Sequence, residues 1–71
     1  MPHVVAVNTA QPYFKVVSMG ATIEFTNDRL AAHNCLSKAT GAFKQLWLIS
    51  KGQARLIREV WNGKELYASQ P

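Results

Sequence analysis

The sequence predicts an α+β protein, an antiparallel sheet of four to six short strands with one helix packed on one face. Three observations predict this class. Short β-branched and aromatic segments are separated by turn residues, one alanine-rich segment has helical spacing, and an Asn-Gly pair joins the last two apolar segments. Because the chain has 71 residues, we expect one compact domain over residues 1–71.

Three strands are expected before the helix. Residues 3–7 form a short β-branched segment, and Tyr13–Ser18 predicts a second strand. After a turn at Met19-Gly20, apolar and polar residues alternate through Ala21–Thr26, which predicts a half-buried strand. The residues expected on its apolar face are Ala21, Ile23 and Phe25.

Residues 28–39 predict the helix, because small apolar residues recur there at helical spacing. Asn27 or Thr26 is expected to cap its N-terminus, and Asp28 suits the positive end of the helix dipole. Gly41 is expected to end the helix in a left-handed conformation. The apolar stripe that faces the sheet consists of Ala31, Ala32, Cys35, Leu36 and Ala39.

The last three strands are expected over residues 43–50, 53–61 and 64–69. Asn62-Gly63 between the last two predicts a hairpin with a two-residue type I′ turn, in which both central residues have positive φ. A three-residue loop would place two glutamates opposite each other, so the two-residue turn is preferred. The expected cross-strand pairs are Glu59 with Leu66, Val60 with Glu65, and Arg58 with Tyr67.

The strand over residues 43–50 is apolar on both faces. By alternation its first face carries Phe43, Trp47 and Ile49, and its second carries Leu46 and Leu48. One short helix covers only one face, so we expect the other to be buried in a homodimer or against a partner. A sheet that curls into a small barrel is the alternative. In the next strand, alternation separates two apolar pairs, Leu56 with Val60 and Ile57 with Trp61.

No residue pattern indicates catalysis, a metal or a cofactor, so the chain is not expected to be an enzyme. His33 and Cys35 lie two apart, so on a helix they point about 200° apart and do not chelate one ion together. Cys35 is expected to be a structural residue of the apolar stripe. Phosphate-binding glycine loops, nucleophile elbows and metalloprotease motifs are all absent from the sequence.

Basic residues interleaved with aromatic residues give the main candidate binding site. Eight Lys and Arg against four Asp and Glu leave a net charge of +4, which suits an acidic partner or nucleic acid. A solvated rim around an aromatic core is the alternative interpretation. By alternation Arg55 and Arg58 fall on opposite faces of their strand. The candidate binding residues are Arg58, Tyr67, Arg55, Lys44, Lys64 and Trp61, and the second choice is the helix face formed by Leu30, His33 and Ser37.

Arg58 is the first of these residues to test. Opposite Tyr67, its guanidinium could stack on the ring and still donate to a carboxylate or phosphate. On a partly exposed hairpin, Arg58→Glu is expected to reduce the free energy of unfolding by no more than about 1 kcal/mol.

From Gly20 onward the order of elements resembles that of very small phage-encoded anti-CRISPR proteins, which inhibit type I surveillance complexes. The residues that carry the resemblance are Gly20, Ile23-Glu24, the helical segment 30–39, the strand segment 43–50 and Gly63-Lys64. It covers roughly residues 20 to 70, and the N-terminal strand has no counterpart. The net positive charge departs from inhibitors of this kind that imitate nucleic acid by their acidity.

The resemblance implies a non-catalytic inhibitor that binds and occludes a host protein or protein–nucleic-acid complex. A single cysteine, no secretory signal and no apolar stretch long enough to span a bilayer predict a cytoplasmic protein without a membrane partner. The resemblance implies that this is the cytoplasm of a host bacterium. The alternative function is a small basic nucleic-acid-binding protein that uses sheet aromatics with Lys and Arg.

Overall fold

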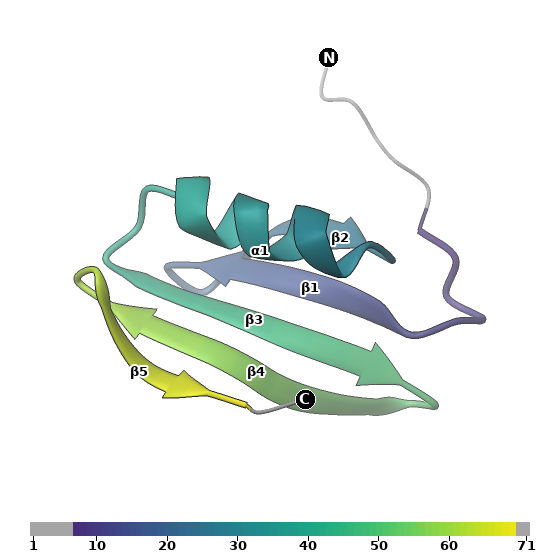
Figure 1. Cartoon of the computed structure of the whole chain (residues 1–71). Helices are drawn as coiled ribbons and strands as arrows, with labels where there is room; N and C mark the ends of the chain where they lie inside the picture. The colour runs from purple at the N-terminus through teal and green to yellow at the C-terminus, as the bar shows by residue number, and fades with distance from the viewer. Residues whose placement is uncertain (1–6, 70–71) are drawn as a thin grey trace, which may run out of the picture.

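Five antiparallel strands and one helix form the protein in the computed structural model, which describes residues 7–69 (Figure 1). The elements are β1 (Tyr13–Ser18), β2 (Ala21–Thr26), α1 (Arg29–Lys38), β3 (Phe43–Ser50), β4 (Gln53–Trp61) and β5 (Lys64–Ala68). The strand order is β2-β1-β3-β4-β5. The predicted α+β class is confirmed, and the sheet is open rather than closed into a barrel. The strand expected over residues 3–7 lies outside the described residues except for Val7, which is in no strand.

Three two-residue turns connect the hairpins, and all have the same backbone conformation. Asn62-Gly63 has φ values of 50° and 79°, so the predicted type I′ turn is confirmed. The turns at Met19-Gly20 and Lys51-Gly52 also have two consecutive positive φ angles. A glycine at the second position accepts this conformation without the steric cost that a Cβ would add.

The helix is capped differently from the sequence-based expectation. Asp28 is the N-cap, and its side chain accepts a hydrogen bond from the backbone N–H of Leu30 at 3.0 Å. Thr26 instead accepts from the N–H of Asp28, and the Asn27 side chain bonds to residues of the segment before β1. The expectation that Thr26 or Asn27 caps the helix is therefore wrong.

Gly41 does not end the helix in a left-handed conformation, because the C-cap is Ala39 with φ −63° and ψ 142°. Lys44 Nζ donates to the carbonyl of Ala39 at 3.1 Å and satisfies one of the last helical acceptors. The structure gives Gly41 another role. A Cβ there would collide with the side chains of Ser18 and Met19, so glycine permits the close approach of the α1–β3 loop to the β1–β2 turn.

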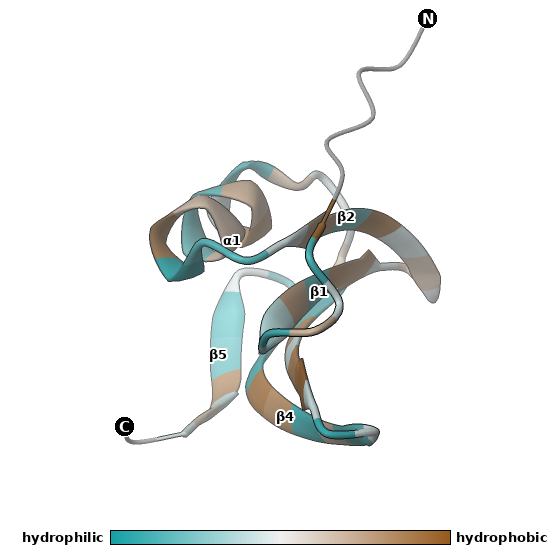
Figure 2. Ribbon diagram, turned by 90° about the vertical axis from the view of Figure 1, so that its right-hand side faces the viewer, coloured by the Kyte–Doolittle hydropathy of each residue, from teal (hydrophilic) through white to brown (hydrophobic). Residues whose placement is uncertain are grey.

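The core lies between α1 and the middle of the sheet. The helix packs on β1, β2 and β3, while β4 and β5 extend past it (Figure 1). A view from the side shows α1 on one side of a strongly twisted sheet (Figure 2). The buried residues of this core are Phe14, Val16, Ala32, Leu36, Leu46 and Val60, with Cys35, Leu48 and Ile57 packed against them. The predicted apolar stripe of the helix therefore faces the sheet.

A β-bulge in β4 changes which residues share a face. Leu46 pairs with Arg58 and Trp47 pairs with Leu56, so Ile57 is an extra residue in β4. Because of this insertion, Ile57 packs with the core on the helix side, and Leu56 faces the opposite way. The prediction that Leu56 and Val60 share a face is therefore wrong, and so is the prediction that Arg55 and Arg58 lie on opposite faces.

The hairpin of β4 and β5 contains a second bulge. Val60 pairs with Glu65 as predicted, but Glu59 pairs with Tyr67, which leaves Leu66 as the extra residue. Arg58 lies opposite Ala68, so the predicted pairing of Arg58 with Tyr67 is wrong.

A third bulge lies in β2, where Ile23 is the extra residue between Thr22 and Glu24. The predicted half-buried strand is wrong in its burial, because residues 21–25 are all exposed. β2 is an edge strand, paired only with β1, so one of its sides has no neighbouring strand. No helix in the described part of the chain is long and apolar enough to cross a membrane.

Candidate binding surfaces

Two surfaces collect the side chains able to bind a ligand or partner, one on each side of the sheet. We call the first the open face, the side of the sheet opposite α1. The pairings of β1 with β2 and β3, of β3 with β4, and of β4 with β5 assign its residues. Its aromatic members are Tyr13, Phe25, Phe43, Trp47, Trp61 and Tyr67.

The open face holds six of the seven aromatic residues of the chain; Phe14, the seventh, is in the core. They are not sealed from solvent: Trp61 is 49% exposed and Tyr67 46% exposed. Phe43 packs edge-on against Trp61, with ring centroids 5.3 Å apart. Within residues 7–69, no helix or strand covers this face. It is a large amphipathic surface of the kind that proteins use for contacts.

Polar groups on the open face are few and mostly hydrogen-bonded to one another. Trp47 Nε1 donates to Gln45 Oε1 at 3.2 Å, and Gln45 Nε2 donates to Glu59 Oε2 at 2.8 Å. The ammonium group of Lys15 lies 6.0 Å from the ring centroid of Trp47, within cation–π range. Lys64 pairs with Trp61 at the hairpin end of this face. Cations and aromatic rings therefore occur side by side.

The second surface is the arginine groove, a hollow of about 510 Å³ on the helix side, where β4 and β5 extend past α1. Arg29 and His33 of α1 line it together with Arg55 and Arg58 of β4. The bulge at Ile57 brings the two β4 arginines to the same side. The remaining lining residues are Phe14, Leu48, Ile57, Ala68 and Ser69. The groove therefore combines guanidinium groups with an apolar floor.

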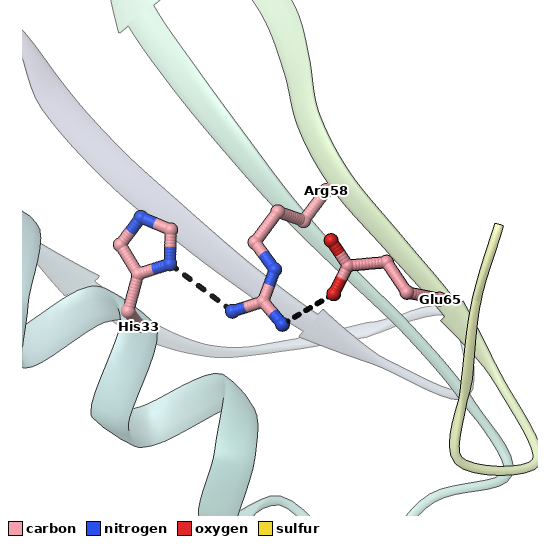
Figure 3. Close-up of polar contacts among 3 residues, drawn as sticks. All are labelled: His33, Arg58 and Glu65. Carbon is pink, nitrogen blue, oxygen red and sulfur yellow. Dashed lines mark hydrogen bonds and ion pairs between the residues drawn. The ribbon is translucent and has the colours of Figure 1, made fainter. Parts of the chain in front are cut away.

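Arg58 connects the helix to the edge strand β5 (Figure 3). One guanidinium nitrogen lies 3.1 Å from Nδ1 of His33, and the other lies 2.7 Å from Oε1 of Glu65. The Arg58 side chain is only 23% exposed. Since guanidinium is always a donor, Nδ1 of His33 accepts, and the neutral imidazole carries its proton on Nε2. This chain of contacts holds Arg58 in a fixed position.

The surroundings of His33 favour its neutral form. Desolvation is the largest cause that lowers the pKa of His33 below 6.5, followed by the positive charges of Arg58 and Arg29; Glu65 has the opposite, smaller effect. Below pH 6.5 the unfolded chain therefore binds a proton that the folded chain binds less readily.

We expect the free energy of unfolding to fall as the pH is lowered from 7.5 to 5.5, and His33→Gln to reduce this loss. The sign follows because the unfolded state binds more protons in this range, so stability rises with pH. Urea denaturation of wild type and His33→Gln at three pH values measures the effect. An unchanged pH dependence in His33→Gln would contradict the assignment.

The structure places six of the nine sequence-predicted site residues on the two surfaces. Arg55, Arg58 and His33 meet in the arginine groove, whereas Trp61, Lys64 and Tyr67 lie on the open face. Lys44 contacts the helix C-terminus. On α1, Leu30 is exposed as expected, and Ser37 is also exposed.

Sequence reasoning did not single out Arg29 for the groove or Lys15 for the open face. The spacing of Arg29 four residues before His33 was a usable signal, because such residues are neighbours on a helix. Lys15 gave no such signal, since its position over Trp47 depends on the pairing of β1 with β3.

Cys35 is half-buried against the core. Burial raises the pKa of its thiol, and the negative charge of Glu24 adds to this, so the reactive thiolate is disfavoured. Among residues 7–69, no group of three His, Cys, Asp or Glu side chains could hold a metal ion.

Comparison with known proteins gives no match: no protein-family model, no curated protein sequence and no solved structure matches this chain.

Proposed function

We propose that the protein is a non-catalytic interaction protein that binds a host protein or protein–nucleic-acid complex through the open face and thereby occludes it. The observation that carries the proposal is the concentration of six aromatic side chains on a sheet face that no described element covers. A soluble protein of this size rarely exposes such a surface unless it makes contacts there.

The composition of the open face suits a protein partner. Trp and Tyr are enriched among the residues that dominate binding energy at interfaces, and charged residues are depleted from interface centres. Trp61 and Tyr67 are about half exposed, so both retain apolar area that a partner would bury. The network from Trp47 through Gln45 to Glu59 holds the centre of the face in one arrangement. A preorganised surface loses less conformational entropy on binding.

The resemblance to very small anti-CRISPR proteins indicates the class of target, a bacterial surveillance complex, and the bacterial cytoplasm as the place of action. A phage or mobile-element inhibitor of this kind needs only a surface that fits its target. Occlusion by contact agrees with a chain of net charge +4, which does not imitate the charge of nucleic acid.

Single-stranded nucleic acid is the second candidate partner of the open face. Lys15 over Trp47, and Lys64 paired with Trp61, place cations beside rings on which bases could stack. Such binding depends steeply on salt, since each neutralised phosphate releases counterions, whereas an apolar protein interface responds little.

Trp61→Ala is expected to weaken binding of the partner at least tenfold, since hot-spot truncations cost about 2 kcal/mol or more. Leu66→Ala is the matched control. Leu66 is an exposed apolar residue of the same hairpin, but as the bulged residue it has no cross-strand partner on the open face. Quantitative pulldown with tagged wild type and both variants, from a bacterium that contains a type I surveillance complex, measures retention of that complex.

We expect wild type and Leu66→Ala to retain the complex, and Trp61→Ala to lose it, at both 50 and 300 mM salt. Equal retention by all three proteins would contradict a role for the open face. A fluorescent oligothymidylate that binds with a steep salt dependence, without retention of any protein complex, would favour the nucleic-acid candidate instead. A homodimer that buries the open face would also contradict the proposal.

A further inference from the structure

The arginine groove is positively charged and lies on the side of the sheet opposite the open face, so the proposed partner of the open face does not contact it. Three arginines contribute to it, the neighbouring Glu65 contributes one negative charge, and His33 is held toward its neutral form, which leaves a net charge of about +2 near pH 7. No acidic residue lines the groove itself. Within residues 7–69, Arg29 forms no hydrogen bond or ion pair, so its donors are available to a ligand.

We propose that the arginine groove binds a phosphate monoester attached to a flat apolar group, the chemistry of a mononucleotide. A phosphate monoester carries a charge of about −1.5 to −2 at pH 7, which matches the net charge of the groove. Guanidinium groups bind phosphate oxygens through paired hydrogen bonds. Arg29 and Arg55 line the groove from two different elements, α1 and β4, so a phosphate bound there would be held by both the helix and the sheet.

The apolar floor provides the second part of the recognition. Phe14, Leu48 and Ile57 line the groove together with the arginines, and all three belong to the core or pack against it. Its volume of about 510 Å³ falls within the usual range for sites that hold a small organic ligand, about 300–1,000 Å³. A ring seated on this floor would bury apolar area that a free phosphate ion lacks.

Glu65 sets the affinity of the groove for an anion. Its carboxylate already receives a charge-assisted hydrogen bond from Arg58 at 2.7 Å and lowers the positive potential there. Removing this charge raises the positive potential of the groove and weakens the hydrogen bond that holds Arg58 at residue 65. Anion binding is therefore expected to strengthen when Glu65 is neutralised, which is the reverse of what loss of an arginine does.

The test is a titration of the full-length chain, followed by amide chemical shifts, with three probes: adenosine 5′-monophosphate, adenosine and inorganic phosphate. We expect the monophosphate to bind at least tenfold more tightly than either of the others. The largest shifts are expected at residues 29, 55 and 58.

Matched variants separate the groove from net charge. Arg55→Gln is expected to weaken monophosphate binding at least fivefold, while Lys64→Gln, which removes the same charge on the open face, changes it less than twofold. Glu65→Gln is expected to strengthen binding about threefold, and Glu59→Gln, the same change on the open face, is expected to have little effect.

Several results would overturn the proposal. If inorganic phosphate bound as tightly as the monophosphate, the apolar floor would contribute nothing to binding. If adenosine bound as tightly as the monophosphate, the arginines would contribute nothing. Equal effects of Arg55→Gln and Lys64→Gln would indicate attraction to net charge alone. Benzoate that binds as tightly as the monophosphate would show that the groove accepts carboxylates rather than selecting phosphate.

Discussion

Leu36→Ala is expected to destabilise the protein by about 3 kcal/mol, within the usual range for a buried leucine. Leu36 is 1% exposed and lies at the centre of the contact between α1 and the sheet. For a domain of this size the loss corresponds to a fall in Tm of roughly 12–24 °C. Since small domains bury a modest share of their surface, much of the stability of this one depends on that contact.

Leu30→Ala is the matched control, because it is the same chemical change in the same helix. Leu30 is 68% exposed, so its replacement is expected to change the free energy of unfolding by less than about 0.5 kcal/mol. Thermal and urea denaturation followed by circular dichroism measure both variants. Similar effects of the two substitutions would contradict the assignment of the core.

Arg58→Glu is expected to destabilise the fold by about 2 kcal/mol, since a charge-assisted hydrogen bond is lost and a carboxylate is placed beside Glu65. This exceeds the value of about 1 kcal/mol expected from sequence, because Arg58 is held between His33 and Glu65 instead of lying over Tyr67. Urea denaturation of the variant measures the change.

The exchange variant Arg58→Glu/Glu65→Arg distinguishes this pair from a general intolerance at position 58. It restores opposite charges, so part of the lost stability is expected to return. A double variant as unstable as the sum of the two single variants would show that the two side chains do not interact.

The hairpins could be predicted from the sequence because their turns depend on local chemistry. Asn62-Gly63 indicates its turn type directly, and the helix follows from spacing within a single segment. The open face was also foreseen in part, since residues 43–50 are apolar on both sides.

The bulges could not be predicted, because nothing in the sequence of a strand marks the extra residue. The two-residue alternation was therefore continued straight through it. The extra residue Ile57 brings Arg55 to the side of Arg58, and this created the arginine groove that alternation had excluded. Likewise, Leu66 moved Tyr67 away from Arg58. Both errors concern the relation between strands, which depends on how side chains pack across the whole sheet.

The extra residue Ile23 lies in β2 and the extra residue Leu66 lies in β5, the two edge strands of the sheet. A bulge interrupts the regular spacing of unpaired N–H and C=O groups along a sheet border. A strand from another molecule then finds no continuous ladder to extend, so fibre-like growth by edge-to-edge addition of sheets is disfavoured. The protein thereby carries six aromatic side chains on one sheet face while both borders of the same sheet are poor templates for polymerisation.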